Sequence, residues 1–280
     1  HVCFLMIPRP PRTTLFPHTT LFRSKTSTAM IPGATIVGDD IAYLRVGKDG
    51  DLRAVNIEKG IFGIIQDVNA KDDPEIYNAL IKPKELIFSN VLTTEDGKCY
   101  WIGMGKEIQI PKAGYNHSGK WEEGKLDKNG KKIPPSHPNA RFTLQLKDLS
   151  NVDSELDNID GVPIGAILYG GRDSDTTVPV AECIDWNHGV FVGATIESET
   201  TTATLGAVGK RESSPMANMD FIIVPLGLYL TNHIKFGKRL KKAPRVYATN
   251  YFIKDDAGNY LNTKLDRSEE HTSELQSPNT

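Results

Sequence analysis

Residues 162–172 read Val-Pro-Ile-Gly-Ala-Ile-Leu-Tyr-Gly-Gly-Arg, and this apolar run with its glycine-rich end decides the expected fold. A short apolar run that is bounded by turn residues is typical of a strand buried inside a sheet, so we predict a strand over Val162–Tyr169. Further strands are expected at Val178–Glu182 and Pro244–Phe252. Because short strands are mixed with few helices, the sequence predicts an α/β protein with a mixed sheet.

The chain before this strand is also expected to be mostly extended. Ala34–Asp40 is rich in β-branched residues and stops at two carboxylates. Ile41–Val46 and Leu52–Ile57 flank the turn Lys-Asp-Gly-Asp at residues 48–51, and this arrangement is typical of a hairpin.

Two helical segments and two irregular segments complete the expected organisation. A short helix is predicted over Asp73–Ile81, with Asp73 as its cap and a proline at its first position. Phe221–Phe236 is expected to be a helix or a strand followed by a helix. The polar stretch Asn116–Pro138 is predicted to be an irregular excursion, and residues 197–214 a mobile loop, because small polar side chains bury little apolar surface.

Composition excludes several classes of protein. The 280 residues are 39% hydrophobic, which argues against a wholly disordered chain. The 33 basic and 35 acidic residues give a net charge of −2, so nucleic acid is not expected as a partner. No apolar run reaches the roughly 20 residues of a membrane span. Three cysteines cannot form a disulfide framework in a chain of this length. We therefore expect a cytoplasmic enzyme.

Both ends of the chain are expected to lie outside the folded domain. Residues 1–24 and 267–280 lack a helical or strand period, and their sequences TTLFPHTTLFRS and RSEEHTSELQS resemble conceptual translations of sequencing adapters. A mitochondrial transit peptide is the alternative for the first tail, but its four prolines disfavour an amphipathic helix. We therefore predict artefactual, disordered tails at 1–24 and 267–280 around an incomplete domain at 25–266.

Lys25-Thr26 and Asp39-Asp40 have the residue types of a nucleotide and metal site. In a phosphate-binding loop, the lysine reaches the phosphates and the following hydroxyl binds Mg²⁺. A carboxylate at the end of a following strand can hold the same metal. The alternative for Asp39-Asp40 is a simple turn at the end of a strand, and the Gly-rich part of the loop is missing before Lys25.

Three further groups of residues could bind an anion or a base. Asn139 and Arg141 lie in HPNARF, and Arg172 follows two glycines. Arginine binds carboxylates and phosphates through paired hydrogen bonds. The alternative is that both arginines are solvated turn residues. Phe252 in NYF is either a core residue or a platform for a base, and the basic run 235–245 is expected to be a solvated helix end.

Seven motifs, in the same order, resemble the GTP-dependent phosphoenolpyruvate carboxykinases, and the resemblance covers essentially all of Lys25–Asp266. The motifs are GDDIAYLR, LRAVNIEKGIFG, HPNARF, LYGGR, WNHGVFVGA, ESETTTATLG and NYFIKD. The resemblance implies the nucleotide-binding half of that fold. It also implies the conversion of oxaloacetate and GTP into phosphoenolpyruvate, GDP and CO₂, in gluconeogenesis or anaplerosis.

The resemblance implies a metal and phosphate site. Asp40 matches the Mn²⁺ ligand of the family, and Asp39 matches a residue that supports the waters of the metal. Lys25, Thr26 and Ser27 match the end of the phosphate-binding loop, where Thr26 binds the Mg²⁺ or Mn²⁺ that accompanies GTP or GDP. Lys25 is counted among the catalytic residues because it contacts the phosphates.

The resemblance also implies roles for substrate-binding residues. Asn139 and Arg141 match the pair that binds oxaloacetate or phosphoenolpyruvate, and Arg141 is expected to hold the carboxylate or phosphate. Arg172 matches the arginine beside the transferred phosphoryl group, where its charge stabilises the transition state. Phe62 matches a residue that lines the active-site cleft.

The guanine pocket and a lid loop are implied in the same way. Phe252 matches one wall of the pocket, and Tyr260 aligns with a second aromatic wall. Residues 198–213 match the lid that closes over the site and excludes water. The lid residues singled out are Ser198, Glu199, Thr200, Gly206 and Gly209.

Departures from the family pattern leave alternatives open. The remaining Mn²⁺ ligands of the family, a lysine and a histidine, lie upstream of Lys25, so we expect this chain by itself to be inactive. Leu265 replaces the third aromatic of the guanine pocket, which weakens the expectation of guanine selectivity. The alternative function is a nucleotide-binding protein without the decarboxylation chemistry. We expect a monomer.

Overall fold

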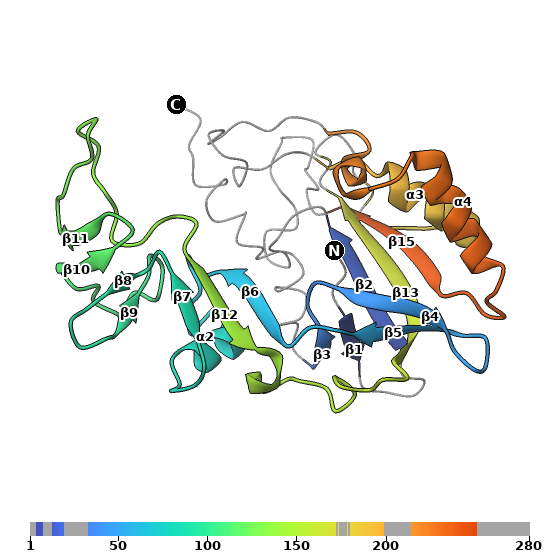
Figure 1. The fold of residues 1–280 in the computed structure, drawn as a ribbon, viewed down its shortest axis with the longest axis horizontal. Coiled ribbons are helices and arrows are strands. Elements are labelled where there is room, and N and C mark those ends of the chain that lie inside the picture. Colours follow the sequence, from blue (N-terminus) through green and yellow to red (C-terminus); the bar gives the residue numbers. More distant parts are fainter. Residues whose placement is uncertain are drawn as a thin grey trace. The chain divides into compact units, whose positions relative to one another are not determined.

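The structure is a computed structural model that describes the backbone of residues 4–7 and 13–19, and residues 33–171, 173, 178, 180–198 and 214–250 with their side chains, apart from that of Asp220. The chain divides into two compact units (Figure 1). Unit 1 comprises residues 1–58 and 151–280, and unit 2 comprises residues 59–150. No helix among the described residues is both long and apolar enough to cross a membrane.

Unit 1 is organised around a mixed sheet. Its central strand β13 pairs in parallel with β15 and β2, whereas β14 and β15 are antiparallel, as are β1 and β2. The order β14-β15-β13-β2-β1-β3 confirms the α/β class with a mixed sheet. The strands are β1 (Phe4–Ile7), β2 (Thr13–Thr19), β3 (Thr35–Gly38), β4 (Ala42–Val46), β5 (Leu52–Asn56), β13 (Val162–Gly171), β14 (Val180–Glu182) and β15 (Arg245–Asn250).

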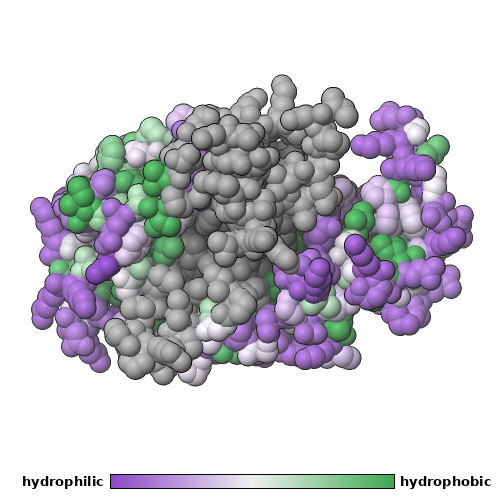
Figure 2. All heavy atoms as spheres, turned by 180° about the vertical axis from the view of Figure 1, so that it is seen from behind, coloured by the Kyte–Doolittle hydropathy of each residue, from purple (hydrophilic) through white to green (hydrophobic). Residues whose placement is uncertain are grey.

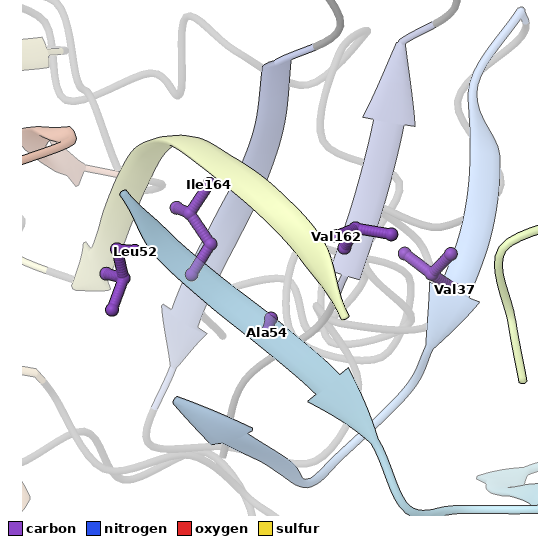
Figure 3. Close-up of a cluster of buried hydrophobic side chains, with 5 residues drawn as sticks. All are labelled: Val37, Leu52, Ala54, Val162 and Ile164. Atoms are coloured by element: carbon purple, nitrogen blue, oxygen red, sulfur yellow. The ribbon is translucent and has the colours of Figure 1, made fainter. Parts of the chain in front are cut away.

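The predicted hairpin near the start of unit 1 is present. Strands β4 and β5 are antiparallel, with Ala42 opposite Asn56 and Val46 opposite Leu52. The start of β13 extends the hairpin by pairing with β5. This arrangement joins residues about a hundred positions apart in the sequence into one buried cluster, which Figure 3 shows. Its members are Val37, Leu52, Ala54, Val162 and Ile164.

The described residues of unit 1 also include two helices and a short 3₁₀ turn. They are α3 (Trp186–Thr195), η2 (Ala217–Phe221) and α4 (Leu226–Gly237). The indole N–H of Trp186 donates to the carbonyl of His233 at 2.9 Å and so joins α3 to α4. Apolar side chains remain on the surface of this part of the chain, among them Phe191 and Leu228. Figure 2 shows hydrophobic surface in green at its left.

Helix α3 was not predicted from the sequence. Gly189 and Gly193 lower the helix propensity of the segment by about 1 kcal/mol each. The structure explains both glycines, because an added Cβ at Gly193 would lie 2.1 Å from the ring of Tyr169, and one at Gly189 would meet Val246 at 2.7 Å. Close packing on the strands therefore decides this helix. Asp185 caps it by accepting the N–H of His188 at 2.8 Å.

Unit 2 contains two small antiparallel sheets and one helix. In the first sheet, β12 (Arg141–Gln145) lies between β6 (Gly60–Ile64) and β7 (Ile87–Ser89) and is followed by η1 (Leu146–Asp148). The second sheet has the order β11-β10-β8-β9. Its strands are β8 (Leu92–Thr93), β9 (Cys99–Tyr100), β10 (Ala113–Asn116) and β11 (Gly119–Glu122).

The helix of unit 2 is α2 (Pro74–Leu80), as predicted, and Asp73 occupies its N-cap position, although its side chain does not cap the N–H groups of the helix. One face of α2 is buried, and its Tyr77 lies edge-on to Trp101, with ring centroids 6.4 Å apart. Trp101 also stacks on Phe88 at 6.2 Å and donates its indole N–H to the carbonyl of Val68 at 2.8 Å. These aromatic contacts are part of the buried core of unit 2, in which Trp101 is 1% exposed.

One expectation about an irregular segment needs correction. Residues 116–138 are partly regular, because β10 and β11 form a hairpin whose Trp121 is buried and donates to the carbonyl of Ile133 at 2.9 Å.

Strand backbone is also present in the first tail, at Phe4–Ile7 and Thr13–Thr19. The residue types FLMI and TTLF favour extended backbone, which the pairing with β3 and β13 then completes. The division into artefactual tails at 1–24 and 267–280 around a domain at 25–266 stays a prediction.

Candidate functional site

The acidic pair Asp39-Asp40 lies directly after β3 in unit 1. The side chain of Asp39 is buried, with 4% of the residue exposed, and Asp40 is partly exposed. One carboxylate oxygen of Glu58, Oε2, accepts the backbone N–H of Asp39 at 3.1 Å and that of Asp40 at 2.5 Å. The turn is therefore held by a third carboxylate, which keeps the backbone of the pair in one conformation.

Glu58 is a site residue that the sequence analysis missed. The hairpin register contained the signal, because Ala42 opposite Asn56 places Glu58 beside Asp40 when the pairing is continued. Asn56 fixes Glu58 in turn: its amide donates to the Glu58 carbonyl at 2.8 Å, and its Oδ1 accepts the Glu58 N–H at 3.0 Å.

The turn that carries Asp39 and Asp40, here called the acidic turn, provides some of the ligands that a divalent cation needs. Carboxylate oxygens are the ligands that hard divalent ions prefer. Within the described part of the chain, however, no group of three or more His, Cys, Asp or Glu side chains is placed to hold a metal ion. Asp39 and Asp40 therefore fit as two members of such a site and do not complete it.

Unit 2 brings two predicted residues, Phe62 and Arg141, together. Arg141 begins β12 opposite Ile64 of β6, and Phe62 lies two residues earlier on β6. Residues that face each other across antiparallel strands share one side of the sheet, so Phe62 and Arg141 lie on the same side. The guanidinium carbon of Arg141 lies 5.3 Å from the centroid of the Phe62 ring, which is within cation–π distance.

The surroundings of Phe62 suit a binding surface better than a core. Phe62 is 59% exposed, whereas Phe142, which points to the other side of the same sheet, is 1% exposed. An exposed phenylalanine that supports a partly buried guanidinium provides an apolar surface beside a fixed positive charge. This arrangement can hold a small carboxylate or phosphate through the forked N–H groups of the arginine.

Asn139 lies in the turn that leads into β12, with its side chain exposed. The turn is closed by the N–H of Ala140, which donates to the carbonyl of His137 at 2.8 Å. The N–H of Asn139 donates to Nδ1 of His137 at 3.0 Å. The structure thus places Asn139 and Arg141 on either side of the buried Ala140, at the start of β12, the central strand of the first sheet of unit 2.

Of the predicted lid, the structure describes only its two ends. Ser198 is buried, and its N–H donates to the carbonyl of Ser214 at 3.2 Å. The N–H of Ala217 donates to the carbonyl of Ile196 at 3.0 Å, so the two ends lie side by side. Several predicted site residues lie outside the described residues: Lys25, Thr26, Ser27, Arg172, Glu199, Thr200, Gly206, Gly209, Phe252 and Tyr260.

The two described cysteines have no features of a nucleophile. Burial raises the pKa of the Cys99 thiol, and burial together with the nearby Asp185 and Glu182 raises the pKa of the Cys183 thiol. Since the thiolate is the reactive form, both groups are poorly activated.

Comparisons with known proteins match most of the chain. The family described as "Phosphoenolpyruvate carboxykinase C-terminal P-loop domain" matches residues 16–264. The phosphoenolpyruvate carboxykinase (GTP) of Pyrococcus abyssi is 54% identical over 246 residues, which cover 87% of this chain and 39% of the relative. The protein of that name from Saccharolobus solfataricus is 49% identical over 244 residues, with 87% and 38% covered.

A more distant relative gives the same result. The phosphoenolpyruvate carboxykinase (GTP) of Anaeromyxobacter sp. is 38% identical over 235 residues, which cover 83% of this chain and 38% of the relative. The chain therefore spans about two fifths of the length of the curated relatives that it matches.

Proposed function

Since the chain belongs to the family of GTP-dependent phosphoenolpyruvate carboxykinases, we propose that it forms the nucleotide- and metal-binding portion of such an enzyme. The reaction converts oxaloacetate and GTP into phosphoenolpyruvate, GDP and CO₂. Loss of CO₂ breaks a carbon–carbon bond and leaves the enolate of pyruvate. The enolate oxygen then bonds to the γ-phosphorus of GTP, and GDP leaves with the electrons of the broken phosphorus–oxygen bond.

The single observation that carries the proposal is the contact between Arg141 and Phe62 beside the turn of Asn139. A guanidinium supported at 5.3 Å by an aromatic ring is pre-organised, so less side-chain entropy is lost when it binds an anion. In the proposed function, Arg141 holds a carboxylate of oxaloacetate or the phosphate of phosphoenolpyruvate. Asn139 adds amide hydrogen bonds to the same ligand.

The acidic turn of unit 1 is assigned to the metal. Asp40 would ligate Mn²⁺ and Asp39 would accept hydrogen bonds from its waters, while Glu58 holds the backbone of both residues. When bound, the divalent ion supplies positive charge that offsets the charge developing on the substrate. The carboxylate chemistry of the turn supports this assignment, and the remaining ligands would come from residues beyond those described.

The nucleotide is assigned to residues that lie outside the described part of the chain. In the proposal, Lys25, Thr26 and Ser27 contact the phosphates and their Mg²⁺ or Mn²⁺, and Arg172 contacts the transferred phosphoryl group. Phe252 and Tyr260 stack on the guanine. The order of the motifs and the match to the family support these roles.

A lid role for residues 198–213 belongs to the same proposal. A loop that covers the site excludes water and protects the enolate from protonation. The paired ends of the segment, at Ile196–Ala217 and Ser198–Ser214, are consistent with a loop that is anchored at a fixed base. The monomeric state, the cytoplasmic location and the inactivity of this chain by itself remain predictions.

The experiment that tests the proposed function compares two ligands. Oxalate stands for the enolate of pyruvate, and binding of oxalate and GDP is measured by calorimetry in the presence of Mn²⁺. We expect Arg141→Ala to lower the affinity for oxalate at least tenfold, because a charge-assisted bidentate contact contributes roughly 1.5–3 kcal/mol. The affinity for GDP should stay within twofold of the wild-type value.

A matched arginine serves as the control. Arg45→Ala removes a guanidinium that forms an exposed ion pair with Asp160 at 4.0 Å, so both affinities should stay unchanged. Binding of GDP without any binding of oxalate would favour the alternative, a nucleotide-binding protein without the decarboxylation chemistry. Equal losses for both ligands in Arg141→Ala would indicate that Arg141 is only structural.

A further inference from the structure

The turn that presents Asn139 depends on one side-chain acceptor. Nδ1 of His137 accepts the backbone N–H of Asn139 at 3.0 Å, two residues further along the chain. This is the geometry in which Asn or Asp side chains hold a turn, here made by an imidazole. The acceptor orients the peptide unit from which the Asn139 side chain projects.

His137 is itself fixed by the neighbouring backbone. Its N–H donates to the carbonyl of Asn90 at 2.9 Å. Asn90 has a φ of 59°, the left-handed conformation that Asn adopts more readily than most residues, and this conformation follows directly on the end of β7. The preceding residue, Ser136, is fully buried and its Oγ accepts the N–H of Ile102 at 3.0 Å. The turn therefore starts from a rigid base.

A second imidazole lies against the His137 ring. The rings of His117 and His137 meet edge to face, with centroids 5.0 Å apart. Burial, together with the charges of His137 and Lys125, lowers the pKa of His117 below its usual value. The acceptor role of Nδ1 of His137 rests on the geometry of the turn, in which the N–H of Asn139 donates to it at 3.0 Å.

We propose that His137 is a positioning residue for substrate binding: its Nδ1 holds the backbone of Asn139 so that the Asn139 amide meets the carboxylate bound at Arg141. The proposal rests on the proposed function, because it assigns a substrate to Asn139 and Arg141. It requires only that the imidazole keeps a lone pair on Nδ1, and His137 does not contact the substrate.

The test uses three variants of the whole chain. His137→Leu removes the acceptor and keeps an apolar side chain, whereas His137→Asn keeps an acceptor, Oδ1, at the same number of bonds from the backbone. His117→Leu is the matched control, because it removes the contact between the rings and leaves Nδ1 of His137 in place. Oxalate affinity in the presence of Mn²⁺ is measured by calorimetry, and exchange of the Asn139 amide hydrogen by NMR.

We expect His137→Leu to lower the affinity for oxalate about three- to tenfold, which is the range for one lost hydrogen bond. The same variant should exchange its Asn139 amide hydrogen faster. His137→Asn and His117→Leu should stay within twofold of the wild-type oxalate affinity. A rescue by His137→Asn would not occur if His137 acted only through packing. Wild-type affinity in His137→Leu, or an equal loss in His137→Asn, would overturn the proposal.

Failure of the proposed function gives a different result. In that case the wild-type chain and Arg141→Ala bind oxalate equally, and the link between His137 and a substrate is withdrawn. Exchange of the Asn139 amide then still reports on the turn: faster exchange in His137→Leu alone would uphold the positioning hydrogen bond, and unchanged exchange would overturn it as well.

Discussion

The two units of the molecule are built from the sequence in different ways. Unit 2 is one continuous stretch, residues 59–150, and its core and its candidate site come entirely from that stretch. Unit 1 joins residues 1–58 to residues 151–280, and its buried cluster pairs Val37 and Leu52 with Val162 and Ile164. Contacts between distant residues cost more loop-closure entropy before they form, so unit 1 depends more on its long-range pairing.

The candidate sites do not share this difference. In unit 2, Asn139 and Arg141 come from one short motif, and Phe62 comes from another strand. In unit 1, Asp39 and Asp40 come from one short motif, and Glu58 comes from the far end of a hairpin. In each site, a motif that is read along the sequence therefore locates two residues, and strand pairing adds the third.

The largest effect on stability is expected for one of two phenylalanines that lie on opposite sides of the same sheet in unit 2. Phe142→Ala should lower the free energy of unfolding by about 3–5 kcal/mol, because it empties a fully buried position. Phe62→Ala, the same substitution on the neighbouring strand, should cost less than about 1 kcal/mol because Phe62 faces solvent. Denaturant titrations followed by tryptophan fluorescence would measure both, and similar losses would contradict the assignment of the two sides.

The equivalent comparison in unit 1 uses two leucines of the hairpin. Leu52 is fully buried and Leu44 is 40% exposed. Leu52→Ala should destabilise the chain by about 2–5 kcal/mol, and Leu44→Ala by less than about 1 kcal/mol. The measurement is the unfolding midpoint in denaturant. An equal shift in both variants would mean that the cluster joining the hairpin to β13 does not stabilise the chain.

A smaller effect is expected at the acidic turn. Glu58→Ala removes the acceptor of two backbone N–H groups and should cost about 1–3 kcal/mol. Glu58→Gln keeps a side-chain oxygen at the same position and should recover most of that loss. Amide exchange of Asp39 and Asp40, measured by NMR alongside unfolding, would connect the change in stability to the turn. Unchanged exchange in Glu58→Ala would rule out this role.

The contact between Phe62 and Arg141 should have a modest effect on binding. Cation–π contacts at exposed sites contribute about 0.5–1 kcal/mol, so Phe62→Leu should lower the affinity for oxalate about two- to fivefold. Phe62→Tyr keeps an aromatic face and is the matched control. Calorimetry gives both affinities, and a Phe62→Leu chain that binds oxalate like the Phe62→Tyr chain would show that the ring does not support Arg141.

The smallest effect concerns the exposed turn between β8 and β9. Hydrogen bonds from Lys98 and then Thr94 lower the pKa of Asp96 to about 2. The folded-state pKa lies below the unfolded one, so the contribution to stability is complete above about pH 4 and is lost as the pH falls towards 2. Asp96→Asn should remove a small acid dependence of the unfolding midpoint. The prediction would be wrong if the wild-type and Asp96→Asn chains had identical unfolding midpoints at every pH from 5 to 2.

Much of the fold and part of the site were predictable from local patterns. The hairpin of β4 and β5, the helix after Asp73 and the buried strand β13 follow from alternation, turn residues and a short apolar run. The family could be identified from ordered motifs, and the comparisons confirm it. Arg141 and Asn139 were named from one of those motifs. All these features are encoded by residues close together in the sequence.

Other features were decided only by the tertiary structure. Helix α3 forms despite two glycines, because they allow it to pack against Tyr169 and Val246. Glu58 acquires its role through the pairing of β4 with β5, and His137 through a turn anchored on Asn90. Local patterns specified the hairpin of β4 and β5, strand β13 and the family, but not the hairpin of β10 and β11. Which side chains meet depended on long-range pairing, because a hydrogen bond or a close contact requires a distance that no local pattern specifies.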